Sequence, residues 1–214
     1  MTVNAVGGAH HNPDVATSAS GDAVVVWDED TDGNGFYQIG LVKLAKANGT
    51  VALTRRSANS LGGGQQQRPA VAADFNGDFA VAWESDHTGT RGVWARSFTA
   101  TGTAGSAEVE ISSVAGAGNP TVGIDDQRDA VVGWSVAGTD PAVWARGLNP
   151  DGTFVVGAGP VRQSGHGRSA GAGRGGFLSV RRARDLVHRR QRRQHLRPGP
   201  AESGGDQLGL VTVG

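Results

Sequence analysis

The chain has 214 residues, a formal net charge of zero and no cysteine, which excludes a disulfide framework and a thiolate metal site. No apolar run approaches the roughly 20 residues of a membrane span, and the first residues lack the basic and apolar segments typical of a signal peptide. The 35 glycines, among abundant Val, Ala, Thr and Ser, favour short strands joined by tight turns over helices.

A repeated pattern begins at residue 12 and sets the predicted elements in chain order. Its three copies start with NPDVATSASGDAVVVWDED at 12, RPAVAADFNGDFAVAWESD at 68 and NPTVGIDDQRDAVVGWSVA at 119. In each copy a proline lies 14 residues, and an aspartate five residues, before a tryptophan: Pro13, Asp22 and Trp27; Pro69, Asp78 and Trp83; Pro120, Asp129 and Trp134. Three copies of one multi-point pattern predict a single structural unit repeated in tandem.

Each copy continues with a basic residue six positions before a turn glycine: Lys43, Arg96 and Arg146 before Gly49, Gly102 and Gly152. We expect four strands per copy. The first strand has the proline at its start, and the second is rich in valine and ends near the tryptophan. The third strand alternates small or aliphatic residues with large or charged ones, and a weaker fourth strand follows it. A period of about 50 residues with four strands predicts an all-β fold, a partial β-propeller of about three four-stranded antiparallel blades.

The repeat also predicts the domain boundaries. These are the end of a preceding repeat (1–12), blade 1 (13–68), blade 2 (69–119), blade 3 (120–167) and a tail without the pattern (168–214).

The pattern P-x-V-A, G-D-x-x-V-x-W, V/I-x-A-R and D-G-T resembles the tandem repeats of large secreted bacterial proteins. The segment SANSLGGGQQQRPAV is similar to the lead-in that often precedes such repeats. The resemblance covers roughly residues 1 to 165 and implies extracellular, propeller-like repeats at a secreted or cell-surface location. It implies no single reaction, and neither the WD40 dipeptide position nor the sialidase-type box is matched.

The tail differs sharply from the rest. Residues up to 167 carry 10 basic and 17 acidic side chains, whereas residues 168–214 carry 10 arginines and three acids. Shifted by one base, the codons of Leu186 and Val187 can encode tryptophan, and those of Ala172 and Gly173 proline, at the spacing of the repeat. We therefore expect a frameshifted fourth blade with little regular structure. The alternatives are a true basic arm that binds nucleic acid and a solvated linker.

The loop DEDTDGNG has the alternating acids of a calcium site, because carboxylates in such a turn can converge on a hard cation. Its candidate ligands are Asp28, Asp30, Asp32 and Asn34, although Ile39 stands where an EF-hand has its bidentate glutamate. A polar hairpin loop without metal is the alternative. The repeated aspartates are interpreted as turn residues that accept backbone N–H bonds, and the repeated tryptophans as core between blades.

No catalytic motif and no cofactor other than calcium is predicted from these residues. The preferred functional hypothesis is a non-enzymatic binding or scaffold module of a secreted or surface bacterial protein, truncated and frameshifted, with a glycan or a protein as its partner. The first alternative is a fragment of a propeller enzyme that acts on glycans. The second, disfavoured, alternative is a nucleic-acid binder working through the tail.

Overall fold

The computed structural model describes residues 7–46, 48–139, 141–155 and 161–164, which form strands and no helix. None of these residues therefore forms a helix long and apolar enough to cross a membrane. The contacts within the chain divide it after Gly171, and every described residue lies in the first unit. The expected frameshifted fourth blade in residues 168–214 lies outside the described residues.

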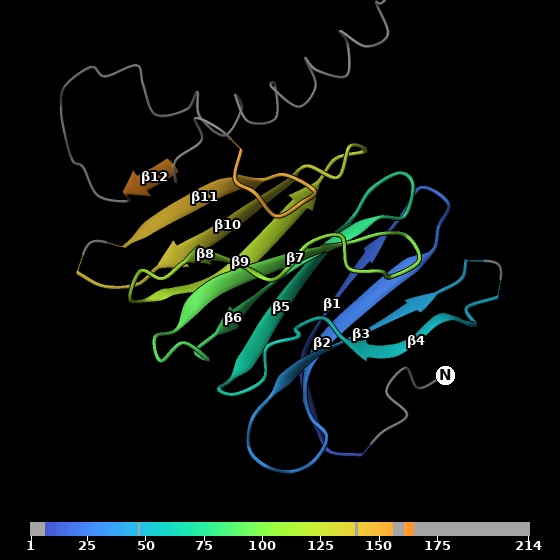
Figure 1. The fold of residues 1–214 in the computed structure, drawn as a ribbon, viewed down its shortest axis with the longest axis horizontal. Coiled ribbons are helices and arrows are strands. Elements are labelled where there is room, and N and C mark those ends of the chain that lie inside the picture. Colours follow the sequence, from blue (N-terminus) through green and yellow to red (C-terminus); the bar gives the residue numbers. More distant parts are fainter. Residues whose placement is uncertain (1–6, 47, 140, 156–160, 165–214) are drawn as a thin grey trace, which may run out of the picture. The chain divides into compact units, whose positions relative to one another are not determined.

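The strands form three four-stranded antiparallel sheets in which neighbours in sequence are neighbours in space (Figure 1). Sheet 1 contains β1 (Ala9–Thr17), β2 (Ala23–Asp30), β3 (Gln38–Leu44) and β4 (Val51–Ser57). Sheet 2 contains β5 (Gln66–Ala73), β6 (Phe79–Ser85), β7 (Gly92–Phe98) and β8 (Val109–Ser112). Sheet 3 contains β9 (Ala117–Ile124), β10 (Ala130–Val136), β11 (Ala142–Leu148) and β12 (Val161–Ser164). The prediction of an all-β chain built from three antiparallel sheets is confirmed.

Sheet 2 is covered on both faces, and this explains why all seven residues of β6 are buried. Its side chains alternate, as in any strand. Phe79, Val81 and Trp83 join a core cluster with sheet 1, whereas Ala80 and Ala82 join a second cluster with sheet 3. Removing a large apolar side chain such as Trp83 from water contributes about 1.5–3 kcal/mol, so the stacking of the sheets supplies the core that one sheet lacks.

Each sheet begins before the proline of its repeat, at Ala9, Gln66 and Ala117. The sequence predicts the proline at the start of the first strand. In the structure it lies inside that strand. The strand accommodates it because the pairing with the second strand shifts at this point, in a β-bulge, where a ladder hydrogen bond is not required.

The repeated arginines join each sheet to the one before it. Arg96 Nη1 donates to the carbonyl oxygen of Ala58 at 3.1 Å, and Arg146 Nη1 donates to that of Ile111 at 3.1 Å. Both acceptors directly follow or belong to the last strand of the preceding sheet. A guanidinium that binds a carbonyl across the joint fixes the position of one sheet against the next.

Lys43 does not take the same position, although its spacing to the turn glycine matches. Val42 pairs with Val25, just as Arg96 pairs with Val81, so Val42 stands where the later sheets have arginine. The turn after β3 has one residue more than the turn after β7, so a basic residue at the same distance from the turn glycine lies one position further along β3. A shift of one residue along a strand places the side chain on the opposite face of the sheet. Lys43 Nζ consequently points forward and donates to Ala100 O of sheet 2 at 3.0 Å.

Candidate functional site

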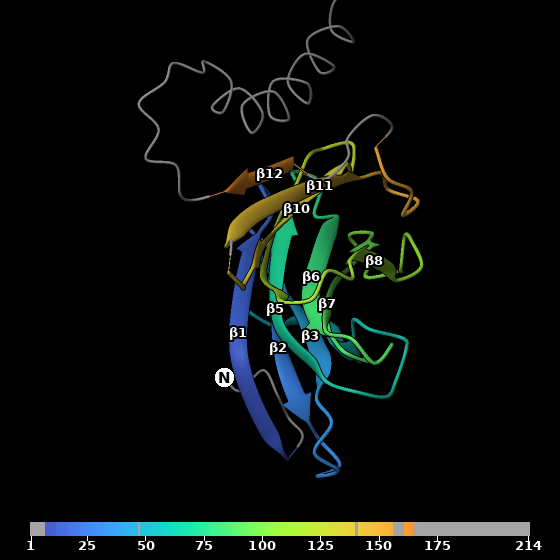
Figure 2. The same cartoon turned by 90° about the vertical axis from the view of Figure 1, so that its left-hand side faces the viewer.

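The first strands of the three sheets line a common hollow. β5 contacts β1 on one side and β9 on the other, and Figure 2 shows β1 and β5 side by side. The hollow has a volume of about 420 Å³ and is open to solvent. Its lining consists of the same three positions of each repeat: Asn12, Pro13 and Asp14; Arg68, Pro69 and Ala70; Asn119, Pro120 and Thr121. Ligand sites are usually concave and largely apolar, with a few convergent polar groups. This hollow is more open and has the convergent polar groups without an aromatic lining.

The residue before each of these prolines has a left-handed backbone. The φ angles are +47° at Asn12, +52° at Arg68 and +50° at Asn119. This region is unfavourable for side chains larger than glycine, and a following proline restricts the residue before it to extended conformations. Such a conformation costs of the order of 1–3 kcal/mol per residue and concentrates at functional sites. Three residues around one hollow therefore have the same unfavourable backbone conformation.

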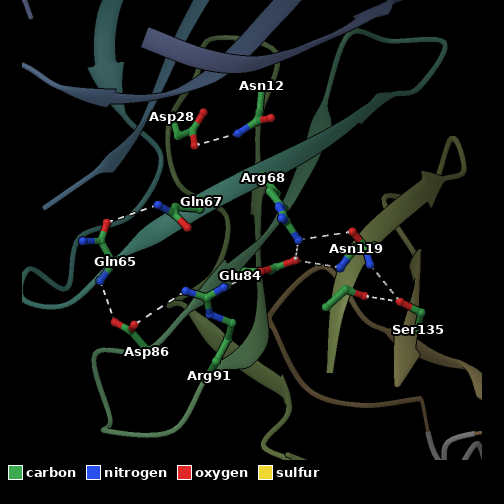
Figure 3. A network of polar contacts seen from close by, with 11 residues as sticks. Asn12, Asp28, Gln65, Gln67, Arg68, Glu84, Asp86, Arg91, Asn119 and Ser135 are labelled. Atoms are coloured by element: carbon green, nitrogen blue, oxygen red, sulfur yellow. Dashed lines mark hydrogen bonds and ion pairs between the residues drawn. The ribbon is translucent and has the colours of Figure 1, made fainter. Parts of the chain in front are cut away.

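The bulge brings each left-handed residue against the residue that follows the repeat tryptophan (Figure 3). Asn12 Nδ2 donates to Asp28 Oδ2 at 3.0 Å, and Arg68 Nη1 donates to Glu84 Oε1 at 3.3 Å. In sheet 3, Asn119 Nδ2 donates to Ser135 Oγ at 3.1 Å. Each repeat therefore supplies one polar side chain at the rim and one acceptor beneath it.

Glu84 joins sheets 2 and 3 beneath the hollow. Its side chain is 3% exposed, and its Oε1 accepts the backbone N–H of Asn119 at 2.8 Å together with the bond from Arg68. Arg91 reaches its Oε2 at 3.5 Å. A side chain at Gly118 would place its Cβ 2.8 Å from Glu84 Oε1, so glycine at this position lets the strand approach the carboxylate without displacing it. Two cations and an N–H bond hold Glu84 as a structural carboxylate.

Two further carboxylates differ from Glu84 in what they contact. Asp14 lines the hollow, is half-buried, and accepts the backbone N–H of Val71 at 2.9 Å through Oδ2, which joins sheet 1 to sheet 2. Asp28 is 2% exposed, and its Oδ1 has no hydrogen-bond partner among the described residues. A buried oxygen without a partner costs free energy. The Asp28 carboxylate, whose other oxygen accepts from Asn12, therefore has an acceptor available beside the rim.

The acids of the expected calcium loop do not converge. Asp28 contacts Asn12, whereas the carboxylate of Asp30 accepts backbone N–H bonds from Gly33 and Gly35, both at 2.9 Å. Burial alone would raise the pKa of Asp30, but these N–H donors outweigh it and lower that pKa. Asp32 accepts from the side chain of Asn34 at 2.8 Å. No group of three or more His, Asp or Glu side chains could hold a metal ion within the part of the chain described, so the calcium loop stays a prediction.

The repeated tryptophans take two kinds of position. Trp83 and Trp134 lie in the clusters between adjacent sheets, at 0% and 3% exposed. Trp27 is also buried, but it lies on the outer face of sheet 1, where its Nε1 donates to Glu29 Oε2 at 2.8 Å.

The repeated aspartates lie at the start of the second strands. Asp22 Oδ1 accepts the backbone N–H of Lys46 at 3.2 Å, and this bond lowers the pKa of Asp22. Asp78 Oδ1 accepts the N–H of Ala100 at 2.6 Å. Both bonds go to the turn after the third strand, not to the turn that contains the aspartate. Asp129 closes its own turn: its carbonyl oxygen accepts the backbone N–H of Asp125 at 3.0 Å, and its backbone N–H donates to Asp125 Oδ1 at 3.0 Å.

Sequence reasoning used the repeated prolines but missed the polar residues directly before them. The signal was present, since Asn, Arg and Asn precede the three prolines in the quoted repeats. What the sequence does not state is that three segments about 50 residues apart meet around one hollow.

No known protein-family profile matches the chain, and no curated protein matches its sequence. Among solved structures, the chain is similar to a glycosyl hydrolase from Bacteroides ovatus, with 9% identity, coverage of 70% of this chain and 49% of that chain, and a TM-score of 0.42. It is also similar to a structure from work on the GH130 family of mannoside phosphorylases, which contains glycoside hydrolases that target β-1,2 mannosidic linkages in Candida mannan. That match has 10% identity, covers 71% of this chain and 50% of that chain, and has a TM-score of 0.43. The chain thus spans about half the length of these structures.

These matches contradict the preferred functional hypothesis, a non-enzymatic module, and favour its alternative, a fragment of a propeller enzyme that acts on glycans. At such identities and TM-scores they assign no residue and no substrate. The chemistry below is therefore argued from the side chains of this chain.

Proposed function

We propose that the chain is part of a β-propeller enzyme that acts on glycans, and that the hollow between its three first strands binds the sugar. Closed propellers have about four to eight blades around a central channel. The three sheets described here would be consecutive blades, with β1, β5 and β9 lining that channel. The basic tail behind the nucleic-acid alternative lies outside the described residues.

The observation that carries the proposal is the repeated, strained polar rim of Asn12, Arg68 and Asn119 around one hollow. Amide and guanidinium groups donate to hydroxyl oxygens, and carboxylate and amide oxygens accept from hydroxyl hydrogens. A ligand with many hydroxyl groups satisfies such a set from several sides at once. The strands and the bonds to Asp28, Glu84 and Ser135 hold the rim in place before binding, which lowers the entropic cost of binding.

Asp14 is the one carboxylate among the residues that line the hollow. Glycoside hydrolysis uses a pair of carboxyl groups on opposite sides of the scissile bond. Glu84 does not serve as the second, because Arg68, Arg91 and a backbone N–H already hold it beneath the rim. The three sheets would thus supply sugar contacts and one acid, and a further sheet around the channel would supply the other.

The test is titration calorimetry of the full chain with a panel of neutral oligosaccharides, each at concentrations up to the millimolar range. Asn119→Ala removes a rim donor and should weaken binding about 2- to 10-fold, the equivalent of one hydrogen bond. Asn76→Ala, an exposed residue in the turn between β5 and β6, is the matched control and should leave binding unchanged. Absence of binding to every oligosaccharide, or equal binding by the Asn119 variant, would overturn the proposal.

A further inference from the structure

The outer face of sheet 3 repeats a surface that is buried in sheet 2. Val93 pairs with Glu84, and Val143 pairs with Ser135, so the two valines occupy the same register position of their sheets. Val93 is fully buried, whereas Val143 is 61% exposed. The residue type and its place are the same, and the difference lies in what covers the sheet.

The cover over Val93 is known in detail. Val93 belongs to a cluster in which Val132, Trp134 and Leu148 of sheet 3 pack against sheet 2. Arg146 of the covering sheet completes the joint through its bond to the carbonyl oxygen of Ile111. A covering sheet therefore brings a tryptophan on its second strand and an arginine on its third.

The outer face of sheet 1 differs from that of sheet 3. On the outer face of sheet 1, Trp27 and Val42 are 4% and 1% exposed. The carboxylate of Glu29 accepts the Trp27 Nε1 proton, pairs with Arg55, and lies 3.5 Å from His10 Nε2. Val42 stands where the later sheets carry the arginine that binds backward. The outer face of sheet 1 therefore does not repeat the exposed surface of sheet 3.

We propose that the outer face of sheet 3 is an interface for one further sheet of this same repeat, with a tryptophan on its second strand and an arginine on its third. The continuity of this face with the buried joint between sheets 2 and 3 identifies the occupant. The inference is independent of the glycan proposal, since it concerns packing alone.

Thiol labelling tests the interface directly, because the chain contains no cysteine. Val143→Cys places a single thiol on the proposed interface, and Val15→Cys places a matched thiol on β1, where Val15 is 59% exposed. Each variant is made in the full chain and in an extended chain, in which a second copy of residues 113–164, with its native linker, follows Ser164. The added copy brings its own tryptophan and arginine.

The thiol at 143 should react with a disulfide reagent as fast as the thiol at 15 in the full chain, and at least tenfold more slowly in the extended chain. The thiol at 15 should react equally in both. Equal reaction of the thiol at 143 in the two chains would overturn the proposal. Protection at 143 in the full chain alone would also overturn it, because a second copy or another segment would then already occupy the face. Circular dichroism of the extended chain verifies that the added copy has folded.

Discussion

Arg128 offers a direct measure of backbone strain in the repeated turns. It lies in the turn between β9 and β10 with a φ of +67°, where the first two sheets have Gly21 and Gly77 at +85° and +88°. A left-handed residue with a side chain costs about 1–2 kcal/mol. Glycine avoids this cost, but it lowers stability by about 0.4–1 kcal/mol because it makes the unfolded chain more flexible. Replacing Arg128 by glycine should therefore relieve about 0.5–1 kcal/mol.

The substitution also removes a contact, since Arg128 Nε lies 3.6 Å from Asp78 Oδ2 in a partly exposed ion pair. Arg128→Ala removes the same contact and keeps the strain, so it is the matched control. Urea unfolding followed by tryptophan fluorescence should show Arg128→Gly more stable than Arg128→Ala by about 0.5–1 kcal/mol, or about 1–4 °C in Tm. If the alanine variant equals or exceeds the glycine variant, the backbone in this turn carries no strain.

Two further predictions concern buried polar groups. Burial, together with the neighbouring charge of Asp78, raises the pKa of Asp74, so its carboxylate destabilises the fold at neutral pH and this penalty vanishes as the pH falls below the ordinary pKa. Asp74→Asn should thus raise the unfolding free energy by roughly 0.5–1 kcal/mol at pH 7, with a gain that shrinks in acid; urea titrations at several pH values would refute this if the gain were constant or grew in acid. Trp83 Nε1 donates to buried Gln66 Oε1 at 2.9 Å, whereas Trp134 Nε1 is buried with no partner among the described residues. Phenylalanine at position 83 should therefore cost about 1–3 kcal/mol more than at position 134, and equal costs in the same assay would contradict the assigned bond.

The repeat made much of the fold predictable from local information. The spacing from Pro69 to Trp83 contains the later part of β5, one turn and most of β6, and both strands form, although β5 begins before the proline. The position of Lys43 was not predictable in the same way. Its distance from Gly49 equals that in the other copies, but the extra residue lies within that distance and becomes visible only in the pairing of β2 with β3. A face is set by register, and spacing to a turn does not fix register.

The candidate site was harder to predict because its residues have no unusual local chemistry. Asn12 and Asn119 read as ordinary turn residues before proline, and their left-handed backbone follows from the bulge within the sheet. The meeting of three strands is a property of stacking, which no single repeat contains. The composition of the acidic loop beginning at Asp28 predicted a calcium site. In the structure, Asp28 accepts a hydrogen bond from the rim residue Asn12, and Asp30 accepts one from the backbone of the loop.

The bulge before each proline also bears on how such a hollow could diversify. Every duplication of the repeat copies the bend, its rim residue and the acceptor beneath it as one unit. A single substitution at that rim position, such as the one that distinguishes Arg68 from Asn12 and Asn119, changes the charge of the surface. Because the position lies on the solvent side of the strand, the tryptophan core needs no repacking. Selection can in this way vary recognition one repeat at a time while the stacked architecture is inherited intact.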